Sequence, residues 1–88
     1  ISQLRKQIDD LDNQLMELLA KRMRVCREIG QYKKEHNMTV LQAARYNEIL
    51  EKRGAQGALC GMDAQFVAKV FEGIHEESVR QQIEIINK

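Results

Sequence analysis

Apolar side chains recur along the first third of the chain at alternating spacings of four and three residues. The positions that follow this spacing are Leu4, Ile8, Leu11, Leu15, Leu18, Arg22, Val25, Ile29, Tyr32 and His36. This heptad pattern predicts one continuous helix over residues 2–35, with a single apolar seam along its length. Gly30 alone weakens the pattern, at a cost of about 1 kcal/mol relative to alanine. Because such a helix runs to about 50 Å, we expect a partner to cover its seam.

Residues 36–38 are predicted to form a turn that follows the long helix. Thr39 with Gln42 three residues later fits a capping box, so we expect the second helix to begin there. This helix is expected to end at Arg53, because Gly54 is a typical C-terminal stop.

The stretch from residue 54 to residue 61 holds three of the five glycines and is predicted to be the main loop. Asp63 is a favourable N-cap for a third helix. One face of that helix mixes apolar and polar side chains, at Val67, Phe71, Ile74, Ser78, Gln82 and Ile85. The sequence therefore predicts an all-α fold of three helices, one of them very long, in a single domain over residues 1–88.

Composition narrows the class of protein. The chain has no proline and 5% aromatic residues, which is typical of helices rather than sheets. Its net charge of +1, with 31% charged residues, argues against a general nucleic-acid binder. Cys26 and Cys60 lack metal-ligand spacing, so we interpret them as reduced thiols and expect no bound metal. No apolar run reaches membrane-spanning length and no signal peptide is evident, so we expect a cytoplasmic protein. The first residue, Ile1, is compatible with an excised domain.

Four polar residues interrupt the predicted apolar faces. Arg22 occupies a seam position, and Lys33 follows it by three turns, roughly 16 Å along the same face. Ser78 and Gln82 lie one turn apart on the inner face of the third helix. Each has an ordinary explanation when taken alone: Arg22 fixes register in a coiled coil, and Lys33 extends to solvent. Together they predict a cationic pocket within the helix bundle, suited to a small dianion.

Arg5 adds a geometric constraint, because it lies about 25 Å of helix away from Arg22. Within one chain the two side chains cannot hold one small molecule. In an antiparallel pair of long helices, Arg5 of one copy reaches the pocket of the other, which makes a dimer obligatory. From spacing alone, an ordinary surface arginine at the helix start is the favoured interpretation of Arg5.

These residues resemble the all-helical (AroQ-type) chorismate mutases over essentially the entire chain. The shared elements, in chain order, are Leu4-Arg5, Ile8-Asp9, Leu11-Asp12, residues 18–22, Ile29-Gly30 leading to Lys33, then Arg45, residues 62–64, Ser78 and Gln82. The resemblance implies an intertwined antiparallel homodimer with two shared active sites, which converts chorismate to prephenate without a cofactor in the shikimate pathway.

The resemblance also implies roles for individual residues. Arg5 of the opposite protomer and Arg22 would bind the substrate carboxylates, with help from Ser78. Lys33 would contact a carboxylate and the ether oxygen, and Gln82 would donate to that oxygen. Arg45 would lie at the edge of the site.

Two positions depart from the family pattern. Gln42 stands where many relatives carry Asp. Tyr46 stands where many carry a Glu that hydrogen-bonds the ring hydroxyl. These departures bear on efficiency and substrate preference more than on the class of reaction.

Two alternatives remain open from the sequence. An isochorismate-pyruvate lyase on the same scaffold would use a similar cationic pocket, and Tyr46 keeps this alternative open. A non-catalytic dimerisation or regulatory module is the other, although it would not need Lys33 and Gln82 together. Relatives often occur fused to another shikimate-pathway or prephenate-processing enzyme, so a covalent fusion partner is also compatible with the chain.

Overall fold

A computed structural model of the protein describes residues 1–88 and contains three α-helices and no strand. The helices are α1 (Ser2–Glu35), α2 (Ala43–Leu59) and α3 (Ala64–Ile86). The predicted all-α fold, with one very long helix, is confirmed. None of the three helices combines the length and apolar character needed to cross a lipid bilayer.

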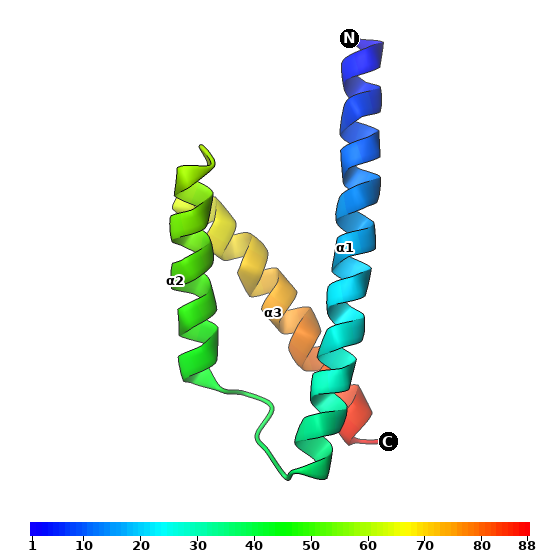
Figure 1. The fold of residues 1–88 in the computed structure, drawn as a ribbon, viewed down its shortest axis with the longest axis vertical. Coiled ribbons are helices and arrows are strands. Elements are labelled where there is room, and N and C mark those ends of the chain that lie inside the picture. The colour runs from blue at the N-terminus through cyan, green and yellow to red at the C-terminus, as the bar shows by residue number, and fades with distance from the viewer.

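Helix α3 connects the other two helices. It packs against both α1 and α2, whereas α1 and α2 do not pack directly on each other. In Figure 1, α3 begins beside the C-terminal end of α2 and runs diagonally to the C-terminal end of α1. The N-terminal end of α1 projects beyond the other two helices in this view. Side chains of all three helices come together only from about Leu15 of α1 onward.

Helix α1 ends where the sequence predicts a turn. His36 is its C-cap, and Asn37 adopts a positive φ of 53°. The Met38 amide donates to the Lys33 carbonyl at 2.8 Å, which closes the turn with a Schellman-type hydrogen bond. Asparagine tolerates this left-handed conformation better than most residues, so residue 37 directs the chain away from α1.

The predicted bounds of α2 are wrong at both ends. Its N-cap is Gln42, whose side chain forms no capping hydrogen bond with the helix. The side-chain Nε2 of Gln42 donates instead to the backbone carbonyl of Thr39 at 3.4 Å. The helix continues through Gly54 and ends at Leu59, so the predicted loop over residues 54–61 is mostly helical. The actual stop is Gly61, which has a φ of +81°.

A close approach between α2 and α3 explains why a glycine lies inside α2 at position 57. A Cβ atom built on Gly57 would lie 2.4 Å from Cγ2 of Val67 in α3. Both residues are buried, so Gly57 lets the Val67 side chain of α3 pack against the backbone of α2. Helix α3 then begins as predicted, with the Asp63 carboxylate accepting from the Gln65 amide at 2.7 Å.

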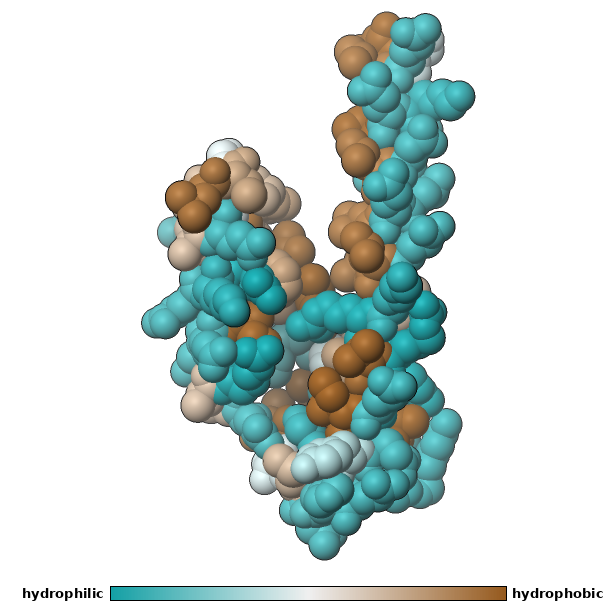
Figure 2. Space-filling model, in the orientation of Figure 1, coloured by the Kyte–Doolittle hydropathy of each residue, from teal (hydrophilic) through white to brown (hydrophobic).

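The protomer leaves most of its apolar seam uncovered. Only 7 of 88 residues are buried, and the seam side chains from Leu4 to Tyr32, Arg22 excepted, are 42% to 63% exposed. Figure 2 shows these apolar residues as a stripe along one side of α1. The accessible surface is 6944 Å², whereas a compact monomer of this mass exposes about 5300 Å². The radius of gyration is 15.6 Å, against about 12 Å for a compact chain of this length.

Candidate active site

The candidate active site is a cavity of about 400 Å³ between the second half of α1, the start of α2 and the second half of α3. Its lining residues combine three cations, four neutral polar side chains, two aromatic rings that also carry polar atoms, and apolar walls. They are Arg22, Cys26, Ile29, Lys33, Val40, Gln42, Arg45, Tyr46, Ile49, Phe71, His75, Ser78, Val79 and Gln82. The cavity is thus built from all three helices and from the connection between α1 and α2.

Lys33 is held at one end of the cavity by two acceptors. Its ammonium donates to the Val40 carbonyl at 2.8 Å and to Oε1 of Gln82 at 2.9 Å. Loss of hydration on burial lowers the pKa of Lys33 from the usual 10.5, and the nearby Cys26 thiol partly opposes this shift. An ammonium has three N–H donors, so one remains for a ligand.

Gln82 and Ser78 continue this hydrogen-bond chain across the inner wall. Both side chains are buried. Nε2 of Gln82 donates to Oγ of Ser78 at 2.9 Å, and Oγ of Ser78 donates to Sγ of Cys26 at 3.0 Å. Because Lys33 must be met by an acceptor, the Gln82 amide oxygen faces it and the amide nitrogen keeps a second N–H free.

Gln82 approaches α1 closely because of Gly30. A Cβ atom built on Gly30 would lie 3.0 Å from the Gln82 Cα and 3.4 Å from its Cβ and Cγ. Gly30, the residue predicted to weaken the long helix, is therefore the position at which Gln82 of α3 packs against α1.

Arg22 lies at the opposite end of the hydrogen-bond chain from Lys33. Its guanidinium reaches Sγ of Cys26 at 3.8 Å, and neither Arg22 nor Lys33 forms a salt bridge with an acidic side chain. Two half-buried cations therefore face the cavity without a counter-charge from the protein. Unpaired buried charge is costly, so this arrangement favours an anionic ligand.

Arg45 and Tyr46 form the side of the cavity contributed by α2. Arg45 is exposed and pairs with Glu48 at 2.8 Å, which places it at the rim. The Tyr46 ring stacks on His75 of α3, with ring centroids 3.9 Å apart and planes 24° apart. Burial, followed by the charges of Glu72 and Glu76, raises the pKa of Tyr46.

The structure brings seven of the eight predicted site residues into this one cavity, namely Arg22, Lys33, Gln42, Arg45, Tyr46, Ser78 and Gln82. Arg5 lies in the first half of α1 and does not line it. His75 was not predicted to belong to the site. The signal was present, because Phe71, His75, Ser78 and Gln82 follow one another at heptad spacing.

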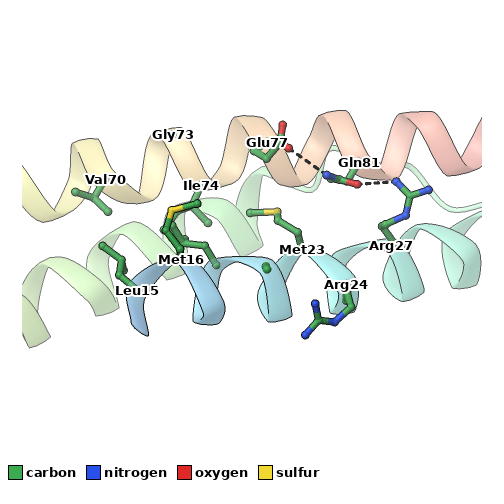
Figure 3. Close-up of a pocket in the computed structure, with 12 residues that line it drawn as sticks. Leu15, Met16, Met23, Arg24, Arg27, Val70, Gly73, Ile74, Glu77 and Gln81 are labelled. Carbon is green, nitrogen blue, oxygen red and sulfur yellow. Dashed lines mark hydrogen bonds between the residues drawn. The ribbon is translucent and has the colours of Figure 1, made fainter. Parts of the chain in front are cut away.

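A second hollow, of about 670 Å³, lies between α1 and α3 and has a different character. Figure 3 shows Leu15, Met16 and Met23 of α1 facing Val70 and Ile74 of α3. The polar groups at its end satisfy one another: Arg27 donates to Gln81 at 2.6 Å, and Gln81 donates to Glu77 at 3.1 Å. A mainly apolar surface of this kind suits a packing contact better than catalysis.

No group of three or more His, Cys, Asp or Glu side chains is arranged so that it could hold a metal ion. The candidate active site offers cationic and amide donors, and these can bind carboxylates and stabilise negative charge on an oxygen atom.

Comparisons with known proteins place the chain in a family. The chain is 30% identical over 84 residues to the bifunctional chorismate mutase/prephenate dehydratase of Buchnera aphidicola subsp. Schizaphis graminum, which covers 96% of this chain and 22% of that protein. It is 33% identical over 79 residues to the Escherichia coli (strain K12) protein of the same name, covering 90% and 20%. It is 28% identical over 83 residues to the 4-amino-4-deoxychorismate mutase of Streptomyces pristinaespiralis, covering 94% and 64%.

The chain therefore spans about a fifth of the length of the two bifunctional relatives. The family described as chorismate mutase type II matches residues 4–83, which is nearly the whole chain and includes every residue of the cavity. The protein belongs to the chorismate mutase type II family.

Proposed function

We propose that the chain catalyses the rearrangement of chorismate to prephenate in the biosynthesis of phenylalanine and tyrosine. The observation that carries this proposal is that Arg22 and Lys33 share one cavity with Gln82 while neither cation has a carboxylate partner. A doubly acidic substrate supplies the missing counter-charge. The cavity volume of about 400 Å³ suits a small molecule.

The chemistry fits the side chains present. In this rearrangement an ether C–O bond breaks while a C–C bond forms within the same molecule, so no nucleophile or proton donor is required. The protein must hold the compact conformer and stabilise the negative charge that grows on the ether oxygen. We assign the second role to the remaining N–H of Lys33 and the free amide N–H of Gln82.

We assign the substrate carboxylates to the other hydrogen-bond donors of the cavity. Arg22 binds one of them through its planar guanidinium, which matches a carboxylate with two parallel hydrogen bonds. Ser78 supports the same end of the substrate, and Arg45 and Gln42 close the rim. No acidic side chain lines the cavity, so nothing there repels the dianion.

The enzyme acts, in this proposal, as an antiparallel homodimer in which Arg5 of each protomer completes the site of the other. The uncovered seam of α1 and the excess of surface over a compact monomer support this arrangement. The apolar hollow between α1 and α3 provides further surface for the partner. Arg5 itself lies too far along α1 to reach its own cavity, since 17 residues of helix span about 25 Å.

Mixing two defective variants tests the shared site. Arg5→Ala and Lys33→Ala should each be nearly inactive. After the two are unfolded and refolded together, half of the dimers are mixed and each contains one intact site, so about a quarter of the wild-type activity should return. Refolding without any recovery would contradict a site shared between protomers.

A turnover assay with chorismate tests the reaction itself. The full chain should form prephenate, and Lys33→Ala should lower kcat/KM by about 10²- to 10³-fold, as expected for the loss of one donor to a developing oxyanion. Lys34→Ala is the matched control, because the neighbouring ammonium is exposed and donates only to the Lys88 carbonyl. Release of pyruvate from isochorismate, instead of prephenate formation, would favour the lyase alternative, and no turnover of either substrate would favour a non-catalytic module.

We also propose that the chain is part of a larger fused enzyme and that this enzyme works in the cytoplasm. The bifunctional relatives support a covalent fusion of this chain to another shikimate-pathway or prephenate-processing enzyme. The free thiols Cys26 and Cys60 support a reducing compartment, the cytoplasm. The mass of the polypeptide detected in cells by an antibody against α3 tests the fusion, and cell fractionation tests the location.

A further inference from the structure

A third hollow lies beside the candidate active site, and the packing of a single protomer leaves it open. It has a volume of about 460 Å³ and lies between the middle of α1, the C-terminal half of α2 and the N-terminal half of α3. Figure 2 shows it as a notch between α2 and the projecting part of α1. Its lining is mostly apolar, with two cations, Arg22 and Arg53, and no aspartate or glutamate. Arg22 and Phe71 also line the active site, so the two spaces share a wall.

Arg53 is the charged group of this hollow that the chain itself leaves unmatched. Its guanidinium donates to Oε1 of Gln56 at 2.9 Å and lies 6.0 Å from the centroid of the Phe71 ring. Arg53 is half-buried and forms no salt bridge with an acidic side chain. A guanidinium has five N–H donors, so several remain free for a carboxylate that the occupant of the hollow supplies.

The N-terminal part of α1, residues 2–14, carries the complementary chemistry. All of its residues are exposed, and Leu4, Ile8 and Leu11 form an apolar stripe that Asp12 flanks. An apolar stripe beside a carboxylate matches an apolar hollow that contains a cation. The accessible surface of the protomer, 6944 Å², also exceeds that of a compact monomer by more than the roughly 800 Å² that each partner buries in a standard interface. A second copy of this chain is therefore the occupant that the surface fits.

The spacing of residues along α1 specifies which part of the second copy reaches the hollow. Arg5, Asp12, Leu19 and Cys26 follow one another at intervals of seven residues, so they share one flank of the helix, about 10.5 Å apart. Leu19 lines the third hollow, and Cys26 lines the active site. In an antiparallel pair, a step toward the C-terminus of one helix is a step toward the N-terminus of the other. A second copy that places Arg5 beside Cys26 therefore places Asp12 beside Leu19, in the hollow that contains Arg53.

We propose that the third hollow binds residues 2–14 of a second copy and that Arg53 forms an ion pair there with Asp12 of that copy. This inference rests on the proposed homodimer with shared active sites. Arg22 is assigned to a substrate carboxylate, so Arg53 is the cation of the hollow that is left for the interface. The twofold symmetry produces two such pairs in each dimer. They set the register of the two long helices, because a slip by one helical turn separates the paired groups by about 5 Å.

Charge reversal on each side tests the pair, with the dissociation constant of the dimer measured by sedimentation equilibrium. Arg53→Glu brings two carboxylates together at each pair, and Asp12→Arg brings two guanidinium groups together, so each variant should raise the constant by at least about tenfold. When the two variants are mixed, they should form a heterodimer in which both pairs again join opposite charges. Its constant, and that of the double variant Arg53→Glu/Asp12→Arg, should return to within about threefold of the wild-type value.

Turnover of chorismate provides a second measurement. At a protein concentration between the wild-type and the variant dissociation constants, each single variant should lose most of its activity, because its sites lack Arg5 of a second copy. The mixture should recover this activity, since both sites of the heterodimer are intact.

A matched pair of controls carries the same charge changes outside the proposed contact. Lys52→Glu changes the exposed cation next to Arg53, which does not line the hollow. Asp10→Arg changes an acid that points about 200° round α1 from Asp12. Neither control should change the dissociation constant by more than about twofold, and their mixture should show no preference for a heterodimer. Raising the salt concentration to about 1 M should narrow the difference between Arg53→Glu and the wild type, because the Debye length falls to about 3 Å.

The outcomes separate this inference from the proposed function. A wild-type dimer that converts chorismate, together with reversal variants that dimerise normally or a mixture without heterodimers, would overturn the inference and leave the mutase function intact. Heterodimer rescue without turnover of chorismate by the wild type would support the interface and overturn the function. Should far-ultraviolet circular dichroism show that the reversal variants do not fold, Arg53→Gln and Asp12→Asn replace them. Each should weaken the dimer, the double variant should weaken it no more than either alone, and additive effects would overturn the ion pair.

Discussion

Replacing Gly30 with alanine should separate the stability of the fold from the placement of one donor in the active site. The new Cβ would lie 3.0 Å from the Gln82 Cα, an approach that real Cβ atoms tolerate only when the neighbour shifts by several tenths of an ångström. The contacted atom belongs to the backbone of α3, so it cannot rotate away. The helix must move, and the Gln82 amide moves with it.

The magnitudes predict a small effect on stability and a larger one on catalysis. Overpacking costs about 1–3 kcal/mol, while alanine gains about 1 kcal/mol over glycine within a helix. The net loss of unfolding free energy should therefore be about 0–2 kcal/mol. A displacement of 1 Å can cost about 10²-fold in rate, so a shift of several tenths should lower kcat about tenfold. KM should change little, because in the proposed mechanism the Gln82 donor acts in the transition state.

Urea unfolding and steady-state turnover of chorismate measure the two effects. Gly54→Ala is the control, because a Cβ there meets nothing closer than 4.0 Å and α2 should gain about 1 kcal/mol. If Gly30→Ala is stabilised as much as Gly54→Ala and keeps the wild-type kcat, the reasoning about the close approach is refuted.

Three further predictions follow from the same structure. Burial lowers the pKa of Lys33, so its ammonium loses its proton as pH rises through a value below 10.5, and kcat/KM should fall there. Lys33→Arg should abolish this alkaline decrease in kcat/KM, and a decrease that persists in the variant would exclude Lys33 as the titrating group. Gly57→Ala should destabilise the protein by about 1–2 kcal/mol in urea unfolding, because the new Cβ meets Val67 at 2.4 Å, whereas Gly54→Ala, with its nearest contact at 4.0 Å, should stabilise it; equal midpoints would contradict the packing argument. Leu11→Asp should shift sedimentation toward the monomer and reduce activity in parallel, and an active monomer would rule out the shared site.

The sequence predicted those features of the fold that depend on local chemistry. The heptad spacing predicted α1, residues 36–38 form the expected turn, and Asp63 caps α3. Gly54 was misread, because a glycine that stops a helix and one that admits a neighbouring helix look alike in sequence. Only the position of α3 tells them apart.

The candidate site was predictable where polar residues broke an apolar face, as Arg22, Ser78 and Gln82 do. His75 was not predicted to belong to the site, because a histidine next to two glutamates resembles a solvent-facing turn of helix. The stack with Tyr46 depends on how α2 and α3 meet, which no spacing within one helix reveals. The contact of Lys33 with the Val40 carbonyl likewise depends on the path of the connection between α1 and α2.

Under the proposed dimer, the projecting N-terminal part of α1 should make the helix content of the protein depend on its concentration. Residues 2–14 are all exposed and have only their own helical hydrogen bonds to hold them. Helices of about 12–15 residues are marginal in water unless something packs on them. This segment should fray in dilute solution and order as copies meet, so mean residue ellipticity at 222 nm becomes a direct readout of assembly. Folding and association would then be one reaction, second order in protein.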